Sequence, residues 1–303
     1  MRKFGVQDMG SQAGKYAVIT GANSGLGYET ARALAWLGAN VTIVCRNKES
    51  GQQAVERIRY QTNGKNILLK LADLEDLNEV RSVAAEISEE LPRLDVLINN
   101  AGIMNVAERT ITPYGLEKQM AVNHFAPFVL TNLLLQAMRK APRPRAVAVA
   151  SMAAYYADFS LDNINAGQKY TPHGVYCTTK LANILFANEL GRREPWLTSV
   201  IAHPGLVHTH IQRNMPQPIK GCFEAIQQTF GQSISEGAKA ILIAATIPHA
   251  KSTMYFGPRN LMKGPVCLVK QPKTAQDKLL AKRFWDLSEE LSSLIKNPLK
   301  SVK

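Results

Sequence analysis

Short apolar runs rich in β-branched residues recur along the first two thirds of the chain and alternate with longer amphipathic segments. The runs are apolar almost throughout, as strands are when helices cover both faces of a parallel sheet. Segments such as Tyr28 to Leu37, Glu75 to Glu90 and Val175 to Arg193 carry apolar residues three and four positions apart, which predicts helices. The predicted strands are Tyr16 to Thr20, Val41 to Cys45, Ile67 to Leu71, Val96 to Asn99, Ala146 to Ala150 and Ser199 to Ala202.

This alternation predicts the α/β class: a single domain with a Rossmann-type, doubly wound parallel sheet of about seven strands and helices on both faces. A short apolar run at Met254 to Phe256 supplies the seventh strand. The 303 residues suffice for one large domain, and no linker or repeat divides them. Ligands bind beyond the carboxyl ends of strands in such a sheet, so we look for chemistry directly after each run.

The alternation stops at Leu206, where a segment rich in Pro, Gln and Gly begins and continues to Ser235. We predict that residues 206–235 form a lid over the substrate pocket. Helical periodicity returns at Glu236 to Thr246. Thr274 to Ile295 has the spacing of an amphipathic C-terminal helix.

The charge of the chain is strongly basic, with 36 Lys and Arg against 24 Asp and Glu and a net charge of +12. Such a charge attracts nucleic acid, anionic lipid or a polyanionic cofactor. Its densest parts, Arg139 to Arg145 and Lys296 to Lys303, contain no interleaved aromatic residues for base stacking. We therefore predict a solvated basic surface and no nucleic-acid partner, and keep a nucleic-acid-binding protein as an alternative.

The cysteines are far apart and form no C-x-x-C pair, which favours neither a zinc site nor a disulfide framework. We therefore predict a reducing location, the cytoplasm. The first 16 residues are polar, and no apolar run is long enough to cross a bilayer, so we expect no integral membrane segment. His208 and His210 lack an obvious third ligand, so we assign no metal.

A glycine-rich turn follows the first predicted strand. Gly21, Gly25 and Gly27 lie within Thr20 to Gly27 (TGANSGLG), at the start of a predicted helix. Glycines allow the backbone to approach a pyrophosphate, and a helix N-terminus offers free N–H groups and positive dipole character. A glycine-rich turn alone is weak evidence, since glycines also serve ordinary tight turns.

The second predicted strand ends in Cys45-Arg46-Asn47-Lys48. An acidic residue at this place would accept hydrogen bonds from an adenosine ribose. Arg46 instead suits a 2′-phosphate through charge-assisted hydrogen bonds, which favours NADP(H) over NAD(H). The alternative is that Arg46 is a surface cation at the start of a helix.

Tyr176 and Lys180 are four residues apart, so both face the same side of a predicted helix. This spacing is common by chance and carries little weight alone. Two other strand ends support it, because Asn99-Asn100-Ala101-Gly102 closes the fourth run and Ser151 follows the fifth. All of these positions are at the edge of the sheet where ligands bind.

In this order the glycine turn, NNAG, Ser151 and Y-x-x-x-K resemble the short-chain dehydrogenase/reductase family over nearly the whole chain. The resemblance implies an oxidoreductase with a catalytic tetrad of Asn123, Ser151, Tyr176 and Lys180. Tyr176 would donate its proton to a substrate carbonyl as hydride arrives from the nicotinamide. Lys180 would favour the phenolate near neutral pH, because a free phenol titrates near pH 10, and would hold the nicotinamide ribose.

The resemblance also implies that Ser151 hydrogen-bonds the substrate oxygen and that Asn123 anchors a water between Lys180 and solvent. Asp73 and Leu74 would cradle adenine, while Val207 and Thr209 would meet the carboxamide. The implied NADP(H)-binding residues are Gly21, Asn23, Ser24, Gly25, Leu26, Gly27, Arg46, Asp73, Leu74, Asn100, Ala101, Gly102, Tyr176, Lys180, Pro204, Gly205, Val207 and Thr209.

Within the family, Lys180 to Phe186 (KLANILF) and Arg283 to Ser288 (RFWDLS) look most like the retinol dehydrogenase-like branch, which includes protochlorophyllide reductases. Retinoid enzymes of that branch commonly carry an apolar membrane anchor, and none precedes Tyr16. We therefore expect a small lipophilic aldehyde, ketone or alcohol as substrate. Expected pocket residues, each of which could equally be core packing, are Met104, Met152, Tyr155, Tyr156, Met215 and Phe223.

A rival function is a non-catalytic sensor that binds NADP(H) without turnover. Ser151, Tyr176 and Lys180 speak against it, because a sensor need not retain an acid and its activating cation. The oligomeric state stays open between a homodimer and a homotetramer, and the sequence does not fix the direction of the reaction.

Overall fold

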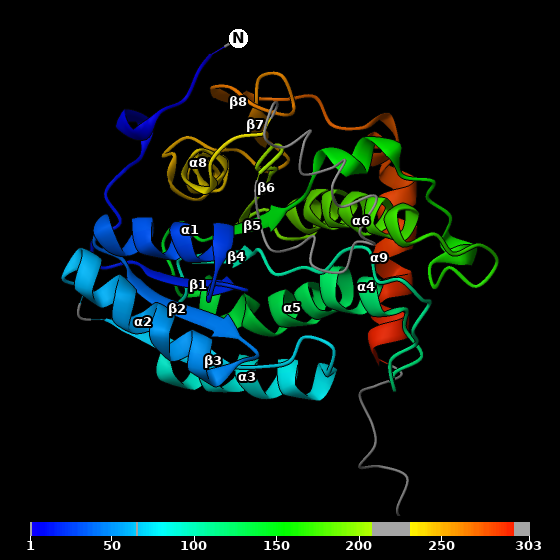
Figure 1. Ribbon diagram of the computed structural model, residues 1–303, viewed down its shortest axis with the longest axis horizontal. Coiled ribbons are helices and arrows are strands. Elements are labelled where there is room, and N and C mark those ends of the chain that lie inside the picture. Colours follow the sequence, from blue (N-terminus) through cyan, green and yellow to red (C-terminus); the bar gives the residue numbers. More distant parts are fainter. Residues whose placement is uncertain (1, 65, 208–230, 294–303) are drawn as a thin grey trace, which may run out of the picture.

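A computed structural model describes residues 2–64, 66–207 and 231–293. In these ranges the chain forms one eight-stranded sheet in the order β3-β2-β1-β4-β5-β6-β7-β8, shown in Figure 1. The order reverses between β1 and β4, which places a crevice at the carboxyl ends of these two strands. The strands are β1 (Tyr16–Thr20), β2 (Asn40–Cys45), β3 (Ile67–Leu71), β4 (Val96–Asn99), β5 (Arg145–Val149), β6 (Thr198–Ala202), β7 (Tyr255–Pro258) and β8 (Val266–Leu268).

All neighbouring strands from β3 to β7 pair in parallel, and β8 pairs antiparallel with β7. The fold class is therefore as predicted, with one strand beyond the expected seven. The extra strand escaped prediction because Val266–Leu268 is only three residues long, too short to show a periodicity. Its outer edge is partly covered by Phe4, which forms an isolated bridge with Val266.

Helices cover both faces of the sheet (Figure 1). Residues of α1 (Gly25–Trp36), α2 (Lys48–Thr62) and α8 (Ile234–Thr246) form a buried cluster on one face. A second cluster on the other face takes in α3 (Leu77–Glu90), α5 (Ala126–Arg139), α6 (Pro172–Arg193) and α9 (Lys278–Ser293). Successive strand residues point to opposite faces, so Val18 belongs to the second cluster and Ile19 to the first.

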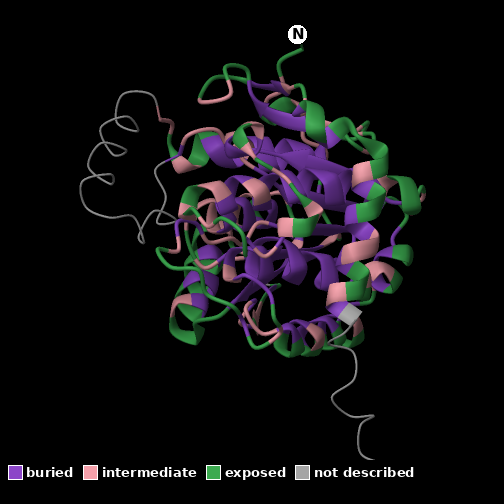
Figure 2. Cartoon of the chain, turned by 90° about the vertical axis from the view of Figure 1, so that its right-hand side faces the viewer, coloured by how far each residue is buried: buried purple, intermediate pink, exposed green. Residues whose placement is uncertain are grey.

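Most strands and the inward sides of the helices are buried, whereas the outward sides of the helices are exposed (Figure 2). The edge strand β3 differs, because Leu68 and Leu71 are exposed. This distribution explains the uninterrupted apolar runs of the strands and the three- and four-residue spacing of the helices. Among the described helices, none combines the length and the hydropathy needed to cross a membrane.

Side-chain caps fix several helix starts near the carboxyl edge of the sheet. Asn47 Oδ1 accepts from Ser50 N at 2.8 Å before α2, and Asp76 Oδ1 accepts from Asn78 N at 2.8 Å before α3. Thr171 Oγ1 accepts from Gly174 N at 3.2 Å, and Pro172 occupies the first turn of α6. These caps satisfy N–H groups that a helix start leaves unpaired.

The C-terminal helix is divided where one continuous helix was expected. A short 3₁₀ helix, η6 (Lys273–Gln276), precedes α9, and Asp277 separates the two. The Asp277 carboxylate accepts from Leu279 N at 2.9 Å and from Leu280 N at 3.0 Å, so it acts as the N-cap of α9. The apolar spacing alone could not show this restart.

The predicted lid, residues 206–235, lies mostly outside the described residues. Its described ends approach each other, because Val207 and Gln232 form a parallel bridge and Gln232 N donates to Leu206 O at 2.8 Å. The two ends thus lie side by side, near the carboxyl end of β6 (Thr198–Ala202).

Candidate active site

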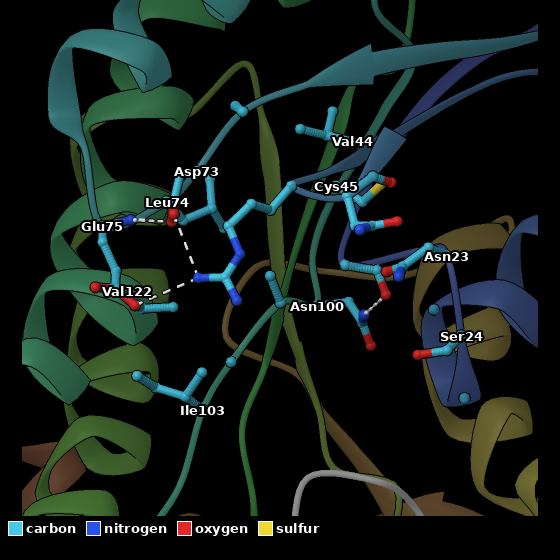
Figure 3. A pocket seen from close by; sticks show the side chains of 18 of the residues that line it. Asn23, Ser24, Val44, Cys45, Asp73, Leu74, Glu75, Asn100, Ile103 and Val122 are labelled. Atoms are coloured by element: carbon cyan, nitrogen blue, oxygen red, sulfur yellow. Dashed lines mark hydrogen bonds and ion pairs between the residues drawn. The ribbon is translucent and has the colours of Figure 1, made fainter. Parts of the chain in front are cut away.

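A cavity of about 310 Å³ lies at the carboxyl edge of the sheet, beyond the ends of the neighbouring strands β1 and β4. Figure 3 shows Asn23 and Ser24 of the glycine turn on one side and Asp73 and Glu75 of the loop after β3 on the other. Its lining residues are Gly21, Asn23, Ser24, Gly25, Leu26, Gly27, Val44, Cys45, Arg46, Asn47, Ala72, Asp73, Leu74, Glu75, Asn100, Ala101, Gly102, Ile103 and Val122.

The backbone of the glycine turn adopts conformations and contacts that require glycine. Gly21 and Gly25 have φ of +64° and +57°, in the left-handed region that favours glycine. A Cβ on Gly27 would collide with the Gly21 carbonyl oxygen, so glycine is required for the turn to pack on the helix. Ser24 caps the 12-residue helix α1 without a side-chain hydrogen bond. The positive end of the α1 dipole thus opens onto the cavity.

The NNAG segment is tied to the first strand. Thr20 Oγ1 accepts from Asn100 N at 3.1 Å and from Ala101 N at 3.0 Å, and Asn100 Nδ2 donates to Thr20 O at 2.8 Å. A Cβ on Gly21 would lie 2.9 Å from Ala101 Cα. The glycine turn and the NNAG segment therefore hold each other in place where both line the cavity.

Arg46 follows β2 and its side chain is 60% exposed. Its Nη1 atom lies 3.3 Å from Asp73 Oδ2 and 3.6 Å from Glu75 Oε1. Lys118 Nζ lies 3.0 Å from Glu75 Oε2, so two cations and two carboxylates form one network. Neither Glu75 nor Lys118 was predicted from the sequence, where the only available signal was that Glu75 follows Asp73-Leu74 directly.

Tyr176 and Lys180 lie one turn apart on α6 and both are buried, with 7% and 3% of their surface exposed. Lys180 Nζ is 5.6 Å from the centre of the Tyr176 ring and donates to Val149 O at 3.1 Å. Ser151, which follows β5, hydrogen-bonds Tyr176. The structure thus brings these three predicted catalytic residues together at the end of β5.

Burial dominates the ionisation of this pair. It raises the pKa of Tyr176 to about 12, although the Ser151 hydrogen bond acts in the opposite direction. Burial also lowers the pKa of Lys180 to about 8. The sequence predicted that Lys180 would favour the phenolate near neutral pH. With that pKa Tyr176 is a neutral phenol near pH 7, and the predicted effect of Lys180 on the phenolate stays a prediction.

Asn123 lies in a π-helical turn, η2 (Ala121–Phe125), between the short helix α4 (Lys118–Met120) and α5. Its Oδ1 accepts from Ile103 N at 2.8 Å. Its Nδ2 donates to Ile103 O at 2.8 Å and to Thr179 Oγ1 at 3.0 Å. The amide therefore joins the NNAG loop to the helix that carries Tyr176. Its predicted role as a water anchor stays a prediction.

Gly102, at the end of the NNAG segment, lies close to both Asn123 and Lys180. A Cβ at this position would lie 3.2 Å from Asn123 Oδ1 and 3.4 Å from Lys180 Nζ. Larger residues would therefore press on both side chains. Gly102 also lines the cavity, so the buried centre adjoins the cavity at this residue.

The loop after β6 lies close to the start of α1, with Gly237 of α8 between them. Gly205 has φ of +76°, and a Cβ on it would collide with the Met262 carbonyl oxygen. A Cβ on Gly237 of α8 would lie 2.5 Å from Val207 Cγ2 and 3.1 Å from Leu26 Cδ2. Gly237 thus permits a close packing that the sequence did not reveal. Predicted positions outside the described residues are Thr209, Met215 and Phe223, together with the histidines at 208 and 210.

Apolar side chains pack against Tyr176. Met104 packs in a buried cluster with Ala153, Tyr176 and Cys177. Tyr155 is partly buried and hydrogen-bonds Lys270 O, whereas Tyr156 is 74% exposed. Tyr156 ends the short helix η3 (Met152–Tyr156), and its place near the pocket stays a prediction.

Comparison with known proteins identifies relatives along nearly the whole chain. A family model described as short chain dehydrogenase matches residues 15–220. Retinol dehydrogenase 14 of Mus musculus is 36% identical over 97% of this chain and 91% of its own length. Retinol dehydrogenase 12 of Homo sapiens is 33% identical over 92% of this chain and 86% of its own length.

A solved structure agrees with these relatives. A putative uncharacterized protein from Mycobacterium Paratuberculosis superimposes with a TM-score of 0.79 at 34% sequence identity. The match covers 96% of this chain and 98% of that protein. The resemblance therefore extends to the three-dimensional fold.

Proposed function

The chain belongs to the short-chain dehydrogenase/reductase family of oxidoreductases, in the retinol dehydrogenase-like group, and from that premise we propose that it uses NADP(H) to interconvert a lipophilic alcohol and its aldehyde or ketone. Tyr176 is the general acid and base of this reaction. The observation that carries the proposal is the grouping of Ser151 with the buried Tyr176 and Lys180, next to a cavity lined by the glycine turn and the NNAG segment.

The residues of the cavity fit NADP(H). The open N-terminus of α1 would hold the pyrophosphate, and Asp73 with Leu74 would hold the adenine. Arg46 would hold the 2′-phosphate and Lys180 the nicotinamide ribose. Asn23, Ser24, Asn100, Ala101, Pro204, Gly205 and Thr209 complete the proposed contacts. When bound, the nicotinamide supplies or accepts the hydride.

The chain's own residues handle the proton. In the reducing direction the substrate carbonyl carbon gains a hydride, and its oxygen gains the phenolic proton of Tyr176. Ser151 donates a hydrogen bond to the same oxygen as negative charge develops on it. Lys180 with a pKa of about 8 is mostly an ammonium near neutral pH, so it stabilises the phenolate left behind. Oxidation reverses each transfer.

A lipophilic substrate is supported by the buried cluster of Met104 and Ala153 next to Tyr176 and by the named relatives, which are retinol dehydrogenases. Retinol is a lipophilic alcohol, so the relatives favour the same chemical class here. We also propose a reducing location such as the cytoplasm, because Cys45, Cys177 and Cys267 are free and buried.

The test is a screen of aldehydes, ketones and retinoids for NADPH oxidation, with Tyr176→Phe as the control. Loss of the phenolic proton should lower kcat by about 10²- to 10⁴-fold, while NADPH binding and thermal unfolding stay close to those of the wild type. Equal turnover by the two proteins would overturn the assignment of Tyr176. NADPH binding without turnover of any substrate would favour the sensor.

A further inference from the structure

The loop after β3 places a carboxylate, Glu75, inside the cavity beside the cation that would read the 2′-phosphate. Figure 3 shows Asp73 and Glu75 on the same wall, opposite Asn23 and Ser24. Glu75 is not among the residues to which the proposed reaction gives a task. It nevertheless lines the cavity and contacts two cations, Arg46 and Lys118.

We propose that Glu75 is a specificity-determining residue that limits the preference of this protein for NADP(H) over NAD(H). The proposal rests on the proposed function, in particular on Arg46 as the partner of the 2′-phosphate. Glu75 acts on that phosphate in two ways, by holding the Arg46 guanidinium and by adding a negative charge to the same wall.

The first effect follows from the geometry of the guanidinium. Arg46 Nη1 lies 3.3 Å from Asp73 Oδ2 and 3.6 Å from Glu75 Oε1, so one nitrogen faces both carboxylates. A phosphate bound by this guanidinium must share it with the two carboxylates or displace them. Because the Arg46 side chain is 60% exposed, its ion pair with each carboxylate is weak, and a phosphate can displace a carboxylate at a small cost in free energy.

The second effect is repulsion. Glu75 is 28% exposed at its side chain, so its charge is only partly screened by water. A phosphate that reaches Arg46 also approaches the Glu75 carboxylate, and like charges in a partly enclosed cavity disfavour binding. NADH has no 2′-phosphate, so neither effect applies to it.

Lys118 reduces the effect without removing it. Its Nζ lies 3.0 Å from Glu75 Oε2, on the carboxylate oxygen that does not face Arg46. The pair holds Glu75 in place and offsets part of its charge. The selectivity of the cavity therefore depends on a balance between Arg46, Lys118 and the two carboxylates.

The experiment measures the dissociation constants of NADPH and NADH, by calorimetry at low salt, for the wild type and for Glu75→Gln. The variant keeps the shape of the side chain and removes its charge. It should bind NADPH about three- to fivefold more tightly, the upper part of the range for a partly exposed charge pair, with NADH binding unchanged. Adenosine 2′,5′-bisphosphate and 5′-AMP should show the same difference without any nicotinamide.

Glu49→Gln is the matched control, because Glu49 is an exposed acid in the first turn of α2 and does not line the cavity. It removes the same charge and should leave the ratio of NADPH to NADH affinity unchanged. A Glu75→Gln ratio equal to or below that of the wild type would overturn the inference and leave the proposed function standing. Absence of NADPH binding by the wild type would overturn both.

Discussion

The adenosine end and the catalytic end of the proposed site differ sharply in exposure. Arg46, Asp73 and Glu75 at the adenosine end have side chains that are 60%, 31% and 28% exposed and are paired with one another. Asn123, Tyr176 and Lys180 at the catalytic end are at most 7% exposed. Charges are screened by solvent and salt at the first end and desolvated at the second.

The difference separates two kinds of task. At the exposed end, a charge can change partners at little cost, which suits the recognition of a ligand phosphate. At the buried end, desolvation raises the pKa of Tyr176 to about 12 and lowers that of Lys180 to about 8, so burial sets the charge of both groups. Substitutions at the buried end should therefore change the rate, and those at the exposed end should change selectivity.

The largest expected effect in this comparison comes from Lys180→Met, which keeps the apolar stem and removes the ammonium. Loss of the group that stabilises the phenolate should lower kcat by about 10²-fold or more, measured as NADPH oxidation under saturating substrate. A variant that retained the full wild-type rate would contradict the assigned role of Lys180.

The same variant reports on the buried charge through its stability. The pKa of Lys180 is lowered to about 8, so the folded state disfavours the ammonium that the unfolded chain still carries. The buried ammonium therefore destabilises the folded protein below about pH 8. This penalty falls as the pH rises, and it is absent above the unfolded pKa of 10.5. Relative to Lys180→Met, the wild type should gain about 1–2 kcal/mol of unfolding free energy between about pH 7 and pH 9.5, measured in urea.

A smaller effect is expected at the exposed end. Arg46→Ala should weaken NADPH binding by about tenfold and change NADH binding much less, because a charge-assisted contact to the 2′-phosphate is lost. Added salt should weaken NADPH binding to the wild type more than to the variant. Equal losses for the two cofactors would show that Arg46 does not read the 2′-phosphate.

Local patterns predicted much of the fold. The apolar runs located β1 and β4 with their observed bounds, because strands buried on both faces leave an unbroken signal. The restart of α9 at Asp277 and the short strand β8 escaped because each depends on a few residues and on neighbours distant in sequence. The parallel sheet also explains why strand-end residues as far apart in sequence as Gly21 and Ser151 were expected at one edge.

The sequence predicted many residues of the candidate site, but not their pKa values or ion pairs. Tyr176 and Lys180 are four residues apart on one helix, so the sequence alone predicts that they are neighbours. The pKa of Tyr176 depends on packing by Met104 and Ala153, which only the folded chain brings together. The ion pairs of Glu75 reach Arg46 after β2 and Lys118 at the start of α4, and no sequence spacing encodes them.

The central claim is that the buried end transfers a hydride with Tyr176 as the proton donor. The direct measurement is to incubate the protein with NADPH that carries deuterium at both positions of nicotinamide C4 and with a lipophilic aldehyde, and to analyse the alcohol by mass spectrometry. The wild type should place a single deuterium on the carbinol carbon, and Tyr176→Phe should form little product. An alcohol without deuterium, or labelled product at the wild-type rate from Tyr176→Phe, would contradict the account.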